Sequence, residues 1–412
     1  MKRRLMLSIL AVMMVMLAGC GKTADSTGDK QRNEDYRYSA GFGMQKVTYQ
    51  PQGVSFQKYG LIYYSEWEDD AMDVICDDPA CEHNTSACGA KVSNFGISLV
   101  HNNRRIIIDP EDAECEIIND TDRIIYGKMA LMEADMNGSN RKKVLTFDMD
   151  LPIVSGIVYD DRLYVAGIQS TYEHQVYNGL VYDESIGDYV PHYTCEQTYS
   201  EAVLCIDLNT YEVTEVFRAD DVVHAHNFVF CADEKAAYVY MCSLLSFDEE
   251  SFEGEYCFAL YQIDGETLTM VTEQTTKNIS WYICGMDDGR LVFIYNHSQG
   301  KELGELDGMF CVNNGQIEKL EGKSICSSLL DGRTYAVKTE DDRYIVEFYE
   351  LETDTLIETI EYPQQLSYIG LYWGKLVYWL PSGSGKYYFA DIKDLKKLGK
   401  NDKLLLSYYD EE

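Results

Sequence analysis

Residues Ser155–Ile168 have the sequence SGIVYDDRLYVAGI, and the prediction of the fold begins with this stretch. Asp160 and Asp161 stand at its centre, and aspartate tolerates the backbone conformations that a tight turn requires. Valine, isoleucine and tyrosine, which favour strands, fill both sides of that pair. The stretch therefore predicts a β-hairpin.

The same pattern of an apolar run, a polar turn and a second apolar run occurs seven times. The other six copies are Ser55–Ser65, Ser98–Asp109, Asn227–Met241, Trp281–Tyr295, Ile325–Lys338 and Ser367–Leu380. Six of the seven are followed by a second hairpin, at Ala130–Leu145, Ala202–Phe217, Cys257–Thr272, Gly308–Leu320, Ile345–Ile360 and Tyr387–Leu398. Two consecutive hairpins make four antiparallel strands, which is the unit of a propeller blade. We therefore predict an all-β fold, a seven-bladed β-propeller of four-stranded antiparallel blades over residues 44–412. Either Val47–Gln50 or Leu404–Tyr408 could close the ring.

The N-terminal sequence predicts an export signal. Three basic residues precede the apolar run Leu5–Leu17, which is too short for a typical membrane span. Leu17-Ala18-Gly19-Cys20 resembles the lipobox of bacterial lipoproteins, in which the cysteine is diacylated and becomes the mature N-terminus; an uncleaved anchor is the alternative. We predict a signal peptide over residues 1–19, a lipid on Cys20, and a flexible polar tether over residues 20–43. The expected location is the extracytoplasmic face of the cell membrane.

The charge of the chain disfavours two kinds of partner. The net charge of −34 falls to about −37 once the three basic residues of the signal are removed. Nucleic acids and anionic lipids need basic contacts, so both are disfavoured. The thirteen cysteines mostly stand singly in strand-like runs, which indicates free thiols in an anaerobic cell better than a disulfide scaffold.

A cysteine–histidine cluster interrupts the first blade. After Met72–Cys76, where a fourth strand is due, the chain continues CDDPACEHNTSAC, with Cys76, Cys81, His83 and Cys88. Three thiolates and one imidazole could close a structural tetrahedral Zn²⁺ site. A disulfide within the trio, with the third thiol free or joined to Cys115, is the rival interpretation.

Ala130–Leu145, with the sequence ALMEADMNGSNRKKVL, resembles a blade of the YWTD and TolB-type propellers in its Asp-x-Asn-Gly-Ser-Asn turn before Arg-Lys-Lys-Val-Leu. Together with the lipobox and the cysteine–histidine cluster, the blades resemble those of uncharacterised β-propeller lipoproteins of anaerobic Firmicutes. That resemblance implies the fold and the membrane address, and it implies no activity.

Long insertions point to one face of the propeller. Gln169–Glu201, Cys242–Tyr256 and Pro110–Arg123 all follow the second strand of a blade, so strand parity places them on the same side. The longest insertion contributes ligand-binding candidates with flat aromatic rings or imidazoles: Tyr172, Tyr177, Tyr182, Tyr189, His192 and Tyr193. Alternatively, these tyrosines pack on their own elongated hairpin.

His224 and His226 share one side of a strand start and could point into the central channel to bind a metal or relay a proton. The alternative is a pair of ordinary loop histidines. The chain has no G-x-S-x-G, P-loop, G-x-G-x-x-G or HExxH motif. We therefore predict a non-catalytic binding or scaffold module for a glycan, a peptide or an envelope protein. A lyase or hydrolase acting on carbohydrate in the central channel is the alternative.

Overall fold

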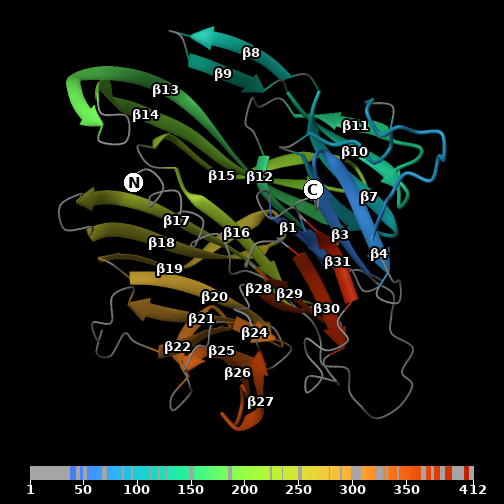
Figure 1. Ribbon diagram of the computed structural model, residues 1–412, viewed down its shortest axis with the longest axis vertical. Coiled ribbons are helices and arrows are strands. Elements are labelled where there is room, and N and C mark those ends of the chain that lie inside the picture. Colours follow the sequence, from blue (N-terminus) through green and yellow to red (C-terminus); the bar gives the residue numbers. More distant parts are fainter. Residues whose placement is uncertain are drawn as a thin grey trace.

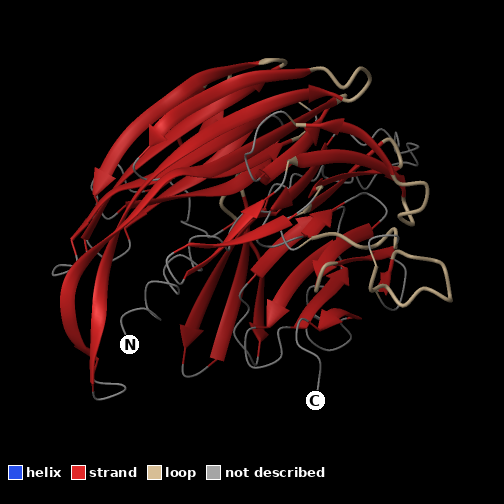
Figure 2. Ribbon diagram, turned by 90° about the horizontal axis from the view of Figure 1, so that it is seen from above, coloured by secondary structure: helices blue, strands red, loops and turns tan. Residues whose placement is uncertain are grey.

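The computed structural model describes the backbone of residues 38–42, 47–49, 53–66, 72–85, 88–93, 96–111, 113–118, 121–126, 128–147, 153–183, 188–222, 225–233, 235–248, 253–277, 279–287, 290–297, 308–320, 328–330, 333–340, 343–362, 368–372, 375–380, 386–391 and 403–407. The predicted signal peptide and Cys20 lie outside the described residues. Within them every regular element is a strand (Figure 2), and none is a helix with the length and apolar character needed to cross a bilayer.

The described strands form one nine-stranded sheet, five four-stranded sheets and one two-stranded hairpin, all antiparallel (Figure 1). The N-terminal half of the nine-stranded sheet contains β2 (Val47–Tyr49), β3 (Gly53–Lys58), β4 (Leu61–Glu66) and β5 (Asp73–Val74). Its C-terminal half contains β12 (Ile153–Tyr159), β13 (Arg162–Asp183), β14 (Asp188–Asp207) and β15 (Val213–Val222). The strand β1 (Tyr38–Phe42) joins the two halves by pairing with β2 and β12.

The four-stranded sheets follow the predicted hairpin pairs. They are β6 (Ile97–His101), β7 (Arg104–Pro110), β10 (Met129–Asp135) and β11 (Lys142–Thr146); β16 (Asn227–Ala232), β17 (Ala237–Asp248), β18 (Glu253–Asp264) and β19 (Thr267–Lys277); β20 (Ile279–Asp287), β21 (Arg290–His297), β22 (Gly308–Asn313) and β23 (Gln316–Lys319); β24 (Ser328–Leu330), β25 (Arg333–Glu340), β26 (Arg343–Glu350) and β27 (Leu356–Tyr362); and β28 (Tyr368–Tyr372), β29 (Lys375–Leu380), β30 (Lys386–Asp391) and β31 (Lys403–Ser407). All seven predicted first hairpins are present.

One second hairpin was predicted wrongly. The sequence placed it at Tyr387–Leu398, whereas β30 pairs with β31, which begins at Lys403. Leu404–Tyr408, considered above for closing the ring, therefore mostly belongs to the outer strand of the last sheet. The other candidate, Val47–Gln50, overlaps β2. This strand pairs with β3 in the N-terminal half of the nine-stranded sheet, which we call the first sheet. Among the described strands, neither segment joins the first and last sheets.

Apolar layers hold neighbouring sheets together, because successive residues of a strand point to opposite faces. In the β12–β13 hairpin, Val158 and Leu163 pack with Leu99, which belongs to the sheet of β6, β7, β10 and β11. Ile157 and Tyr164, one residue along each strand, pack instead toward β16–β19. A third layer joins β16–β19 to β20–β23. The continuous apolar runs of the sequence therefore mark strands buried on both faces.

The N-terminal strand β1 lies among the first strands of several sheets. It pairs along its whole length with β12, from Tyr38 opposite Tyr159 to Phe42 opposite Ser155, and it also contacts β6 and β16. Tyr38–Phe42 had been assigned to the flexible tether. The tether prediction therefore extends too far, because β12 offers β1 an open edge of backbone donors and acceptors that the sequence does not reveal.

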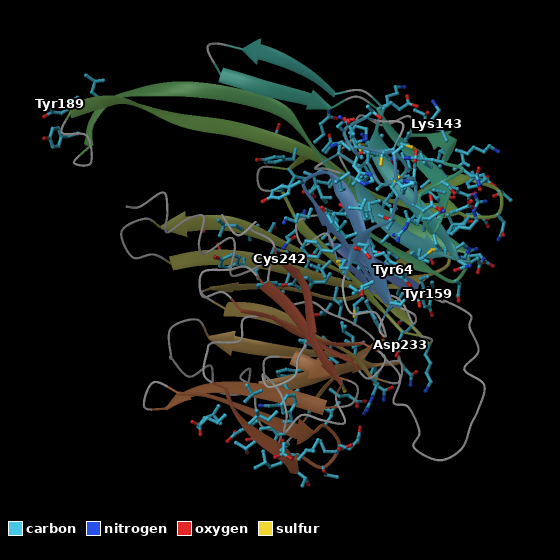
Figure 3. The ribbon with its side chains drawn as sticks, turned by 45° about the vertical axis from the view of Figure 1, so that its right-hand side comes forward. Tyr64, Lys143, Tyr159, Tyr189, Asp233 and Cys242 are labelled. Atoms are coloured by element: carbon cyan, nitrogen blue, oxygen red, sulfur yellow. The ribbon has the colours of Figure 1, made fainter. Side chains whose placement is uncertain are left out.

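The three long insertions leave the body on the same side (Figures 1 and 3). Gln169–Glu201 continues β13 and β14 as a long hairpin, and Cys242–Tyr256 continues β17 and β18. Pro110–Arg123 begins a separate hairpin of β8 (Ala113–Ile118) and β9 (Thr121–Tyr126).

A buried arginine joins the first two sets of strands. Arg105 on β7 is fully buried; its Nε donates to the carbonyl of Met136 at 2.6 Å and its Nη1 to the Ser55 hydroxyl of β3 at 3.0 Å. The guanidinium also lies over the Tyr64 ring, 5.6 Å from its centroid. Its Nη2 has no hydrogen-bond partner, and burial lowers the pKa of Arg105 to about 10. A buried charge without a carboxylate depends on all of these contacts.

Arg105→Lys should therefore destabilise the protein more than Arg105→Met. Lysine brings the same charge into the dry site but cannot reach the separate acceptors with one ammonium group, whereas methionine removes the charge and keeps most of the volume. We expect Arg105→Lys to lower the free energy of unfolding, measured with urea, by about 2–4 kcal/mol. Arg104→Lys is the matched control, since Arg104 pairs with Glu133 on a partly exposed face; it should change the value by less than about 1 kcal/mol. Equal stability of Arg105→Lys and the wild type would contradict this account.

Candidate functional site

The cysteine–histidine loop, residues 76–88, replaces the outer strand of the first sheet. The chain runs beside β4 as β5, with Val74 opposite Tyr63, and the Ile75 amide donates to the Ile62 carbonyl at 3.1 Å. It returns to β4 where the Ile62 amide donates to the Ala90 carbonyl at 2.9 Å. The described residues between these contacts contain no strand, as the sequence predicted.

An apolar base lies under this loop. Ile75, Ala90 and Val92 are buried against Ile62 of β4 and Ile107 of β7. Cys88 is a buried member of the same cluster, and the partly buried Cys76 and Cys81 pack against it. The loop is therefore fixed at both ends by packing, and its polar middle is left to be organised by its own side chains.

The structure brings the four predicted ligands together. The sulfur atoms of Cys76, Cys81 and Cys88 and a ring nitrogen of His83 all lie within 4.8 Å of one another. His83 Nδ1 is 3.4 Å from Cys88 Sγ. His83 has a φ of 54°, an unfavourable conformation for a residue with a side chain, and the fold maintains it where the imidazole meets the thiols.

The donor set fits a closed zinc site. Zn–S bonds of ~2.3 Å and Zn–N bonds of ~2.0 Å in a tetrahedron separate the donors by roughly 3.5–3.8 Å, close to the spacing of this cluster. All three thiols are free, with no disulfide among them. Burial raises the pKa of the Cys88 thiol to about 11, so a metal must displace its proton in order to bind. Four protein ligands leave no open position for a substrate.

Polar contacts fasten the loop to the neighbouring sheet. Arg141 donates to the Lys91 carbonyl at 2.5 Å and lies 3.5 Å from the Asp109 carboxylate. Both Asp109 oxygens accept from the Ser93 amide, at 3.0 and 3.1 Å. Burial raises the pKa of Asp109 and lowers that of Arg141. The Ser93 hydrogen bonds and the Arg141 guanidinium oppose the effect of burial on the pKa of Asp109.

Two glycines allow the loop to approach the β10–β11 turn closely. A Cβ on Gly89 would lie 2.1 Å from the Gly138 carbonyl oxygen. Gly138 also has a φ of 77°, which other residues rarely adopt. Beside this contact lies a cavity of about 1070 Å³ whose lining includes Cys76, Asp78 and Asn140. No aromatic ring is among its described lining residues, so this cavity offers no stacking surface for a sugar.

The tyrosine candidates belong to a different part of the molecule. The arm, as we call residues 170–198 of the β13–β14 hairpin, extends beyond the rest of the body, with Tyr189 near its tip (Figure 3). Tyr182 and Tyr189 are opposite each other in the register. Their rings meet edge to face at 5.1 Å between centroids, and they remain 51% and 62% exposed. The insertion forms an elongated hairpin, and this pair of rings is in mutual contact while staying accessible.

The remaining arm candidates are placed by backbone only. Tyr177 is opposite Tyr193, and Tyr172 is opposite Thr198. The side chains of Tyr172, Tyr177, His192 and Tyr193 lie outside the described residues. The structure therefore assembles one tyrosine pair, and it places this pair far from the cysteine–histidine loop (Figure 3).

His226 has a partner that the sequence did not suggest. Glu201 of β14 is completely buried; its Oε2 lies 2.6 Å from His226 Nδ1, and its Oε1 accepts from the His226 amide at 2.5 Å. The imidazole thus contacts the third strand of the neighbouring sheet. His224 lies outside the described residues. The one signal for Glu201 was an acidic residue directly before the apolar run AVLCI.

No protein-family model and no curated protein matches the sequence. Among solved structures, the chain is similar to β-propeller proteins. The β-propeller domain of the Trilobed protease from Pyrococcus furiosus is 9% identical, with 74% of this chain and 80% of that chain covered and a TM-score of 0.39. An oligogalacturonate lyase in complex with manganese is 10% identical, with 71% and 72% covered and a TM-score of 0.38. The nidogen/laminin complex is 10% identical, with 74% and 92% covered and a TM-score of 0.30. Similarity at this level concerns the fold, and it gives no basis for assigning to this chain an activity, a metal or a partner from those proteins.

Proposed function

We propose that this protein is a lipid-anchored, extracytoplasmic β-propeller of seven blades that acts as a non-catalytic binding module of the cell envelope. Cys20 carries the lipid, and the propeller presents the arm to a glycan, a peptide or an envelope protein. The single observation that carries the proposal is the exposed Tyr182–Tyr189 pair on a projecting hairpin. Exposed tyrosines on a rigid support are typical of binding surfaces, because they offer large contact area at low entropic cost.

The arrangement of β1 supports a binding role over a catalytic one. β1 contacts the first strands β6, β12 and β16, where a propeller would otherwise have its central channel. A backbone strand in that position leaves less room for a substrate. The buried Glu201 and its partner His226 lie on the third strand of a sheet and in a connection.

We further propose that the cysteine–histidine loop binds a structural Zn²⁺. The metal would replace the hydrogen bonds of the absent strand by holding residues 76–88 in one conformation. Arg141 and Asp109 hold the far end of the same segment. The outer edge of the first sheet would then be fixed by a metal on one side and an ion pair on the other.

Zinc analysis tests this site. The purified protein should contain about one zinc per chain, and Cys88→Ser should lose the metal and lower the thermal midpoint. Lowering the pH should release the zinc, because protons compete for ligands that bind as thiolates. Cys311→Ser is the control: Cys311 is equally buried but lies on β22, away from the cluster, so zinc should remain. A metal-free protein with two fewer titratable thiols would establish the disulfide instead.

Shortening the arm tests the binding role. Replacing residues 171–198 by Asn-Gly would close the hairpin at the Ser170–Tyr199 pair with a favourable two-residue turn. The variant should keep its circular dichroism spectrum and thermal midpoint but lose binding on glycan and envelope-protein arrays that the wild type recognises. The matched control replaces residues 112–127, which carry the β8–β9 hairpin, by the same turn, and it should keep the binding. Unchanged binding by the arm-shortened protein would refute this role.

A carbohydrate-active enzyme is the second candidate, and the Glu201–His226 pair is the observation that favours it. A buried carboxylate on Nδ1 fixes the ring and its tautomer and leaves Nε2 as a proton acceptor. Side-chain exposure of His226 is 20%, so solvent reaches the ring.

If the protein degrades a polysaccharide, His226→Asn should reduce the rate by about 10²–10⁴-fold while leaving the thermal midpoint near that of the wild type. Glu201→Gln should lower the rate by a smaller factor and shift the pH profile of the rate. The reason is that Glu201 orients the His226 base without contacting the substrate. Product formation would be followed by reducing-end or unsaturated-sugar assays over a panel of polysaccharides. Turnover that persists in His226→Asn would remove this pair from consideration.

A further inference from the structure

We propose that the tip of the arm binds an extended, lysine- and arginine-rich polypeptide. This inference rests on the proposed binding role of the arm and adds the chemistry of its partner. It follows from three features of the same hairpin: its exposed rings, its charge and its open backbone edges.

The exposed rings give the first argument. Leu180, Tyr182 and Tyr189 are each more than half exposed, and they come from the last few pairs of the hairpin. In the edge-to-face arrangement of the two tyrosines, one ring face is not covered by the other ring. Such faces attract lysine and arginine side chains through cation–π contacts.

The charge of the arm gives the second argument. Between Arg162 and Arg218 the sequence holds nine acidic residues and no lysine or arginine. Five of the nine lie in the arm: Glu173, Asp183, Glu184, Asp188 and Glu196. The arm thus has no lysine or arginine of its own that could neutralise these acidic residues. Only a protonated histidine could contribute a positive charge.

The register sharpens this argument. Asp183 is directly opposite Asp188 in the backbone register at the end of the hairpin, which places two acidic residues side by side. A cation bound at the tip would neutralise part of this negative charge. A neutral glycan would not, and a second copy of this chain, with its net charge of −34, would add to it.

The backbone supplies the third argument. β15 pairs with β14 only as far as Tyr199, opposite Val222, and β12 pairs with β13 only as far as Gly167, opposite Ile153. Beyond these pairs no described strand lies against either edge of the arm. Soluble proteins commonly protect such edges with lysine, which is absent here. An extended partner chain can add to an open edge through main-chain hydrogen bonds, and a basic partner would bring positive charge to this acidic hairpin.

The test uses the full-length protein in detergent and a fluorescein-labelled twelve-residue peptide of alternating lysine and valine. A peptide with glutamate in place of lysine and a labelled neutral hexose oligosaccharide serve as comparison probes. We expect fluorescence anisotropy to show binding of the lysine peptide alone, and the affinity to fall as salt is raised. Tyr182→Ala with Tyr189→Ala should weaken binding about tenfold. The corresponding double phenylalanine variant should stay within about twofold of the wild type, because it keeps the rings.

A matched charge control separates the arm from the general acidity of the chain. Asp183→Asn, Glu184→Gln and Asp188→Asn together should weaken binding at least about tenfold and reduce its salt dependence. Glu266→Gln, Glu318→Gln and Glu361→Gln remove the same charge from exposed positions on other sheets, and they should leave the affinity within about twofold. Equal weakening by the two triple variants would show non-specific attraction and overturn the proposal.

The oligosaccharide separates this inference from the role on which it rests. Arm-dependent binding of the sugar without binding of the lysine peptide would overturn the cationic partner and keep the arm as a binding element. If the arm-shortened variant binds every probe as the wild type does, both ideas are wrong.

Discussion

Face-to-face packing of sheets that are apolar on both sides is the constraint on which this structure depends. Ile157 and Val158, adjacent in β12, belong to two different apolar layers, so neither sheet that they contact can be removed without exposing one of them to water. At roughly 25 cal/mol per Å² of apolar surface, these layers are the main source of stability. Turns and connections then need only join one layer to the next, and insertions such as the arm can lengthen without disturbing the core.

The first sheet shows what happens where this constraint is weakest. Its outer strand is missing, and the loop that replaces it buries few apolar side chains, chiefly Ile75, Ala90 and Val92. Directed interactions then take over: the cysteine–histidine cluster, the Arg141–Asp109 pair and, deeper between the strands, Arg105. These interactions are specific in geometry and costly to leave incomplete. The outer edge of the first sheet is thus stabilised by a small number of directional contacts more than by apolar packing.

Local chemistry explains which parts of this fold could be predicted. The hairpins could be predicted because the turn residues and strand formers lie within one short segment, as in Ser155–Ile168. The members of the cysteine–histidine cluster could be found because they lie close in sequence. The pairing of Glu201 with His226, and of β1 with β12, could not be derived, since each depends on how separate strands meet in space. The last outer strand was misplaced for a related reason. The pattern of residues in a single sequence does not show how long the connection between two paired strands is.

The free cysteines of the described strands have a further consequence. Burial raises the pKa of Cys205, Cys257 and Cys311, and that of Cys242 to about 12, so these groups remain protonated and poorly nucleophilic in the folded protein. They lie on β14, β18, β22 and β17, which belong to three different sheets. Cys205 and Cys311 are buried, so an alkylating reagent would modify each of these two thiols mainly when its own strand opens. The rates at which the buried thiols are alkylated during unfolding would therefore report the order in which their sheets open.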